Sequence, residues 1–146
     1  MTALIMLANW AVNAQTPPVD EKGLAIGGYD VVAYFNSQPT KGNPTITYKY
    51  EGATYRFANN QNRDLFLGNP TKYLPQFGGY CAWGVAAKEA KFPINPETYD
   101  IIDGKLYLFF NGEFNGDNFN TSLLWNQETS SLKTAAHKNW PKVKSK

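Results

Sequence analysis

Cysteine and histidine are scarce in this chain of 146 residues, which has one of each, Cys81 and His137. A single cysteine excludes an internal disulfide. Two such ligands are too few for a structural zinc site, which takes four Cys or His side chains. A Ser-His-Asp triad would have to use His137 as its base. Phosphate-binding loops and the common zinc-protease and calcium-loop motifs are absent from the sequence as well.

A strong charge of either sign is also lacking. Lys and Arg total 14 against 12 Asp and Glu, which leaves a net charge of +2. Because nucleic-acid-binding domains usually present a strongly basic face, we expect no nucleic-acid partner. Several lysines gather towards the C-terminus, and we interpret them as a solvated helix face and a tail, with a site for an anionic partner as the alternative.

No hydrophobic run is long enough to cross a bilayer, so we expect no stable membrane span. Residues 1–14 are apolar and end in Val12-Asn13-Ala14, which resembles a signal-peptidase site although no basic segment precedes it. We therefore expect a signal peptide over 1–14 and a periplasmic or secreted protein. An extended leader over 15–22, a domain over 23–142 and a tail over 143–146 would follow.

Aromatic and apolar residues are plentiful, at 15% and 42% of the chain. This is enough to build the core of one domain without a disulfide. Dense Gly and Pro punctuation predicts short elements joined by turns, and no internal repeat is expected.

Two β-hairpins are the clearest local features. Residues 45–50 and 53–58 flank Glu51-Gly52, and a second pair of strand-like runs flanks Asp103-Gly104. Asp-Gly and similar pairs favour the tight turns that join antiparallel strands. We expect the two hairpins to form one small antiparallel sheet.

Helices are predicted around the hairpins. Asn59-Asn60 should cap a helix through residue 68, with Leu65 and Phe66 facing inward. Pro70 should open a second short helix, since proline suits the first helical position.

The remaining segments are less regular. Residues 78–88 read as a glycine turn that continues into a helix. Residues 29–35 are either a short strand or a helical turn opened by Asp30. A long helix is expected over 120–139, ended by Pro141. The fold class is therefore α+β: a small antiparallel sheet packed with short helices and a long C-terminal helix.

Three stretches together resemble the exported YHS-domain family. They are residues 25–35 (AIGGYDVVAYF), 50–86, which include GGYCAW, and 103–111 (DGKLYLFFN), followed by NWPK at 139–142. The resemblance covers about residues 23–142. It implies a module that handles a heavy metal, copper foremost. Related modules carry several cysteines, whereas this chain has Cys81 alone and no CxxC.

Cys81 is the sharpest candidate for chemistry. It follows two glycines and lies between Tyr80 and Trp83. A thiolate binds soft metals such as Cu(I) and attacks electrophiles. A small buried hydrophobe is the alternative interpretation. His137 is the candidate second metal ligand, with an exposed helical histidine as its alternative.

Five further residues are candidates for binding a ligand. Tyr80 and Trp83 would form the aromatic wall of a pocket for a planar or apolar molecule, or else belong to the core. Tyr29, Asp30 and Arg63 are polar groups within the family-like stretches. Arg63 would alternatively pair with Asp30 or with Asp64 and serve the fold.

Three functions follow. The first is an exported module that binds a soft metal ion such as copper through Cys81. One thiolate cannot saturate such a metal, and no methionine remains beyond residue 14, which weakens the copper case. The alternative is a non-enzymatic domain that binds a small molecule or a protein through an aromatic pocket. The third is a thiol enzyme with Cys81 as nucleophile. The oligomeric state is left open.

Overall fold

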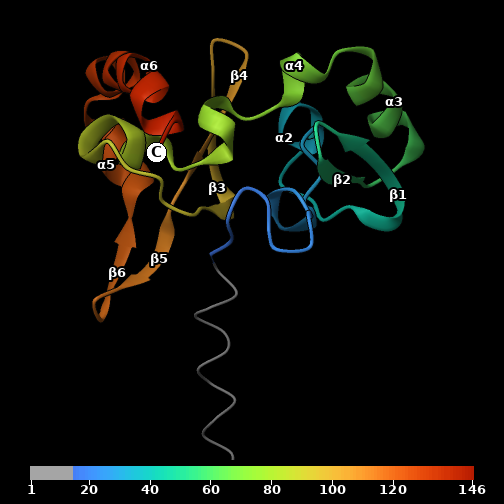
Figure 1. Ribbon diagram of the computed structural model, residues 1–146, viewed down its shortest axis with the longest axis horizontal. Coiled ribbons are helices and arrows are strands. Elements are labelled where there is room, and N and C mark those ends of the chain that lie inside the picture. Colours follow the sequence, from blue (N-terminus) through green and yellow to red (C-terminus); the bar gives the residue numbers. More distant parts are fainter. Residues whose placement is uncertain (1–14) are drawn as a thin grey trace, which may run out of the picture.

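The computed structural model describes residues 15–146, so the expected signal peptide lies outside the described residues. The β3–β4 hairpin lies in the middle of the molecule (Figure 1). The β1–β2 hairpin lies on one side of it with α2, α3 and α4, and the β5–β6 hairpin lies on the other with α5 and α6. The α+β fold class with a long C-terminal helix is therefore confirmed.

Six strands form three antiparallel hairpins, each a separate two-stranded sheet. They are β1 (Asn43–Tyr50), β2 (Ala53–Phe57), β3 (Asn95–Ile102), β4 (Lys105–Phe109), β5 (Asn111–Phe114) and β6 (Asp117–Asn120). Glu51-Gly52 and Asp103-Gly104 close the first two hairpins, as predicted, with positive φ at all four residues. The third hairpin turns at Asn115-Gly116 and was not predicted.

The single expected sheet is thus replaced by three small ones. Isolated bridges, and not further strands, continue the pairing beyond the hairpins. Leu24 pairs with Thr54 of β2, and Thr16 pairs with Ile94 just before β3. The segment over 15–22 is accordingly tied to the domain by backbone hydrogen bonds.

Short helices separate the hairpins. They are η2 (Ile26–Gly28), α2 (Ala33–Asn36), α3 (Asn60–Gly68), α4 (Pro70–Tyr73), η3 (Gln76–Gly79) and a π-helix, η4 (Gly84–Lys88). Asn59 caps α3 by accepting a hydrogen bond from the backbone N–H of Asn62 at 2.8 Å. Phe66 is fully buried as expected, but Leu65 is 42% exposed, so its predicted inward orientation is wrong. Adjacent helical residues point about 100° apart, and only Phe66 faces the β1–β2 hairpin.

The C-terminal helix differs from its prediction in the middle and at its C-terminal end. It is divided into α5 (Thr121–Gln127) and α6 (Thr129–Lys144) at Glu128, whose backbone is not helical. The predicted stop at Pro141 is wrong, because α6 continues through it to Lys144. Val143 is fully buried, and this offsets part of the roughly 3 kcal/mol that an interior proline costs. Residues 143 and 144 therefore belong to the helix and not to a tail.

The structure also reveals an internal repeat that was not expected from the sequence. The β1–β2 and β3–β4 hairpins have the same length, the same register and the same irregularity. Asn43 pairs with Phe57, and Asn95 pairs with Phe109. Each residue of the second hairpin therefore lies 52 positions after its counterpart in the first, and all five paired positions agree.

The same unit begins with a left-handed turn in both copies. Ile26-Gly27-Gly28 have φ of 50, 59 and 84°, and Phe77-Gly78-Gly79 have φ of 58, 62 and 89°. Here the separation is 51 positions. A bulky residue in this region is strained by about 1–2 kcal/mol, so the surrounding packing must hold each turn in place. A tyrosine and a fully buried residue follow, Asp30 in the first copy and Cys81 in the second.

Two insertions distinguish the second copy from the first. The helix after the turn has four residues in the first copy (α2) and five in the second, where it becomes the π-helix η4. This extra residue changes the separation from 51 to 52. The β5–β6 hairpin is the second insertion, since β2 leads almost directly into α3, whereas the hairpin lies between β4 and α5. Both copies contribute to one continuous hydrophobic core.

Candidate functional site

Cys81 is sealed in the core, with none of its surface exposed. Its Sγ lies 3.2 Å from Thr121 Oγ1 and accepts a hydrogen bond from the backbone N–H of Gly84 at 3.4 Å. The Thr121 hydroxyl donates to the carbonyl oxygen of Phe110 at 2.9 Å, so the thiol is the donor towards Thr121. Burial raises the pKa of the Cys81 thiol, which favours its neutral form.

The internal repeat gives Cys81 a structural counterpart. Asp30 Oδ1 accepts hydrogen bonds from the backbone N–H groups of Val32 and Ala33, at the start of the helical turn. Cys81 does the same for Gly84 at the matching place in the second copy. The helical-turn interpretation of residues 29–35 is therefore correct, and Cys81 has the position of a helix-capping residue.

His137 has a different set of neighbours. Its Nε2 lies 3.0 Å from the hydroxyl oxygen of Tyr107, and its ring lies 4.9 Å from that of Phe77. Partial burial and the nearby Lys133 lower the pKa of His137. The structure therefore gives Cys81 and His137 separate polar partners.

This arrangement does not fit the copper ion that the family resemblance implies. The thiol is neutral, shielded and already engaged with Thr121. Across residues 15–146, no group of three or more His, Cys, Asp or Glu side chains is placed to hold a metal ion.

The structure places Tyr29, Asp30 and Arg63 in separate interactions. The carboxylate of Asp30 is fully buried and accepts from the side-chain amide of Asn62 at 2.8 Å. Arg63 instead lies 3.8 Å from Asp64 in a partly exposed ion pair. The Tyr29 hydroxyl donates to Glu97 at 2.9 Å.

Of the two predicted aromatic wall residues, only Trp83 borders a pocket that suits an organic molecule. This pocket has a volume of about 840 Å³, within the range of small-molecule sites. Its walls are mostly aromatic: Trp83, Lys88, Phe92, Pro93, Phe110, Glu113, Phe114, Phe119 and Leu124. Tyr80 lies elsewhere, against Trp140 and beneath the ammonium group of Lys91.

The aromatic rings of the pocket contact one another in a closed set. Trp83 lies 5.5 Å from Phe119 and 6.3 Å from Phe92, measured between ring centroids. Phe110 lies within 6.5 Å of Phe92, Phe114 and Phe119. Phe114 is 57% exposed at the rim, so the pocket opens to solvent along the β5–β6 hairpin.

Cys81 and Thr121 support this pocket from behind. The backbone N–H of Cys81 donates to the carbonyl oxygen of Phe92 at 3.1 Å. The backbone N–H and hydroxyl of Thr121 both donate to Phe110. Two wall residues are thus fixed by the pair that Cys81 and Thr121 form.

A glycine shapes the wall further. A Cβ at Gly84 would lie 2.9 Å from the ring of Phe92, closer than real Cβ contacts allow. Only glycine lets this ring lie directly against the π-helix.

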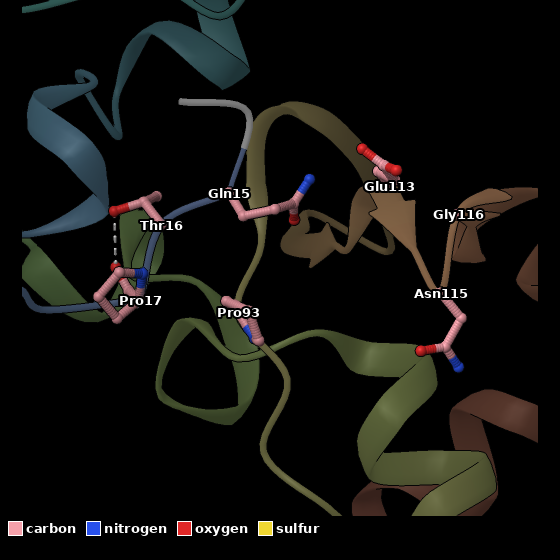
Figure 2. Close-up of a pocket in the computed structure, with 7 residues that line it drawn as sticks. All are labelled: Gln15, Thr16, Pro17, Pro93, Glu113, Asn115 and Gly116. Carbon is pink, nitrogen blue, oxygen red and sulfur yellow. Dashed lines mark hydrogen bonds between the residues drawn. The ribbon is translucent and has the colours of Figure 1, made fainter. Parts of the chain in front are cut away.

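A second, more open hollow adjoins the pocket. It has a volume of about 540 Å³ and shares Pro93 and Glu113 with the aromatic pocket. Figure 2 shows the Gln15 side chain extending from the N-terminal segment towards the β5–β6 hairpin, with Asn115 at the hairpin's tip. The side-chain amide of Gln15 donates to the carbonyl oxygen of Asn111.

Most of the pocket residues were missed from the sequence. Phe114 and Phe119 lie on either side of Asn115-Gly116, a strong hairpin signal that marks the third hairpin. No local signal joins them to Trp83 or Phe92, because the pocket forms only when distant segments pack together.

The comparisons with protein-family models, curated proteins and solved structures gave no match to this chain. Within residues 15–146, no helix combines the length and the apolar character needed to span a membrane.

Proposed function

We propose that this protein is a non-enzymatic binding module that holds a small, planar, apolar organic molecule in the aromatic pocket. One observation carries the proposal. Both insertions that distinguish the second copy of the repeat border this pocket: η4 ends at Lys88, and the β5–β6 hairpin supplies Glu113, Phe114 and Phe119. A π-helix is frequently found at functional sites.

The character of the walls favours a ring system as the ligand. Aromatic rings pack well against other rings in offset and edge-to-face arrangements. Burying about 250 Å² of a two-ring ligand contributes roughly 6 kcal/mol at 25 cal/mol per Å². This alone corresponds to a dissociation constant of tens of micromolar, and association costs offset part of it, so we expect weaker binding than that.

A thiol enzyme has less support, because Cys81 is buried and its Sγ contacts Thr121 and Gly84 rather than a base among residues 15–146. The soft-metal role of Cys81 and His137 stays a prediction, and the donor geometry gives it little support. Membership of the YHS family and export to the periplasm or beyond also stay predictions.

N-terminal sequencing tests export: Gln15 as the first residue of exported protein would support it, and an intact Met1 on a cytoplasmic product would contradict it.

A neutral fluorescent probe, phenylnaphthylamine, tests the proposed function. We expect saturable fluorescence enhancement with the purified protein and at least a fivefold loss of affinity in Trp83→Ala. Trp140→Ala is the matched control, since Trp140 is also half-buried but packs on Phe77 outside the pocket. Circular dichroism confirms that both variants fold. Equal binding by both variants, or no binding by the native protein, would refute the proposal.

A further inference from the structure

Lys88 gives the aromatic pocket a charged end. It is the last residue of the π-helix, and its ammonium nitrogen lies 5.7 Å from the centroid of the Trp83 ring. The corresponding helix of the first copy, α2, has no basic residue in its last turn. The cation is thus a feature of the copy that has the pocket.

No carboxylate within residues 15–146 pairs with this cation. The nearest acid along the chain, Glu89, forms an ion pair with Lys142 at 2.5 Å, and its carbonyl oxygen accepts from Lys146 at 3.0 Å. The remaining ion pairs of the described residues involve Arg63 and Lys133. Lys88 is therefore available to a ligand.

The helix α6, which packs against η4, is also basic. It carries Lys133, Lys138, Lys142 and Lys144 with no acidic residue, and Lys133 and Lys142 are paired with Asp103 and Glu89. The other charged residue of the pocket, Glu113, lies on β5 and also borders the second hollow. Two charged residues thus line the pocket: Lys88, beside the face of Trp83, and Glu113, on the hairpin.

We propose that the ligand of this pocket is an aromatic anion: a planar ring system with one carboxylate or sulfonate group. The rings lie against Trp83 and Phe119, and the anionic group lies at Lys88. This inference rests on the proposed function and specifies its ligand class. A cationic group would be repelled by the Lys88 ammonium beside Trp83 and would have to bind near Glu113 instead.

Two probes with the same ring system test the inference. Anilinonaphthalene sulfonate carries an anionic group that phenylnaphthylamine lacks. For the native protein we expect the sulfonate to bind more tightly, and Lys88→Met to weaken its binding by about three- to tenfold, the size of a partly exposed charge contact. Binding of phenylnaphthylamine should change less than twofold.

Lys138→Met is the matched control, because Lys138 is an exposed lysine of α6 that does not border the pocket. Added salt should reduce the preference for the sulfonate in the native protein and leave Lys88→Met unaffected. Mutual displacement of the two probes shows that they share one site.

The outcomes separate the two proposals. If neither probe binds, the proposed function is wrong and the ligand class falls with it. If both bind with equal affinity and Lys88→Met changes neither, the pocket stands and the anion inference alone is overturned. A similar loss of sulfonate binding in Lys138→Met would also overturn it, since the effect would then be one of overall charge.

Discussion

Replacing Asp30 with alanine should reveal how much of the fold depends on one buried carboxylate. Asp30 is fully buried, and its two oxygens accept four hydrogen bonds. The donors are the backbone N–H groups of Val32, Ala33 and Ala58 and the side-chain amide of Asn62. These contacts join the first helical turn, the end of β2 and α3.

The expected loss follows from the donors left without a partner. Ala33 retains a second acceptor, the carbonyl oxygen of Asp30 at 3.1 Å, so three donors are orphaned. Each buried, unsatisfied donor costs at least about 1 kcal/mol, which gives a destabilisation of at least about 3 kcal/mol for Asp30→Ala. Asp30→Asn keeps one acceptor oxygen and should lose roughly half as much.

Urea unfolding followed by circular dichroism measures this loss. We expect a lower midpoint with an unchanged dependence on urea concentration. Asp64→Ala is the control, since its side chain is 71% exposed and its ion pair with Arg63 should contribute less than about 0.5 kcal/mol. A destabilisation below about 1 kcal/mol for Asp30→Ala would refute the structural role and reopen Asp30 as a ligand-binding residue.

Three further predictions follow from the buried groups and the pocket wall. Burial raises the pKa of Tyr55 to about 12, whereas a tyrosine in the unfolded chain ionises near pH 10. Above pH 10 the unfolded chain therefore loses this proton first, and the free energy of unfolding should fall between about pH 10 and 12. Melting temperatures recorded from pH 8 to 12 should fall over that window, and less steeply in Tyr55→Phe. Native Cys81 should resist Ellman's reagent at pH 8 and react after the protein is unfolded. In a Cu(I) titration, Cys81→Ser should bind as much copper as the native protein. Copper binding that is lost only in Cys81→Ser would instead establish the soft-metal role. Gly84→Ala should displace the Phe92 ring, destabilise the protein by about 1–3 kcal/mol and weaken phenylnaphthylamine binding. Gly68→Ala is the control: nothing lies within 4 Å of the new Cβ, so probe binding should not change.

Local chemistry made part of the fold predictable. The hairpins at Glu51-Gly52 and Asp103-Gly104 depend on turn residues and on neighbouring apolar strands, both of which are visible in a short window. Asn115-Gly116 is as strong a turn signal, but its hairpin was missed. Its strands are mostly polar and exposed, so they lack the alternation that identifies a half-buried strand.

The internal repeat was hidden for a different reason. Its two copies share backbone conformation and register more than they share residues. Ile26 and Phe77 occupy the same left-handed position, and Asp30 and Cys81 occupy the same capping position. Comparing residue types does not reveal that an aspartate and a cysteine are equivalent, although both side chains accept hydrogen bonds from the backbone that follows them.

The candidate site shows where sequence reasoning stops. Trp83 borders an aromatic pocket, whereas Cys81, two positions earlier in the sequence, faces the core. The direction of each side chain depends on how η4 packs against α6 and on the tertiary contact between Cys81 and Thr121. Neither contact can be predicted from the residues that neighbour Cys81 and Trp83 in the sequence.

The pocket is assembled from residues scattered between Trp83 and Leu124, and this couples ligand binding to unfolding. An unfolded chain retains none of this site, so any true ligand binds the folded state alone. At a concentration 100 times its dissociation constant, such a ligand adds about 2.7 kcal/mol to the free energy of unfolding. For a chain of this size the melting temperature would rise by roughly 5–10 °C. The melting temperature of the protein therefore reports ligand binding directly, and a thermal-shift screen of aromatic acids would find the natural ligand without an assay for its function.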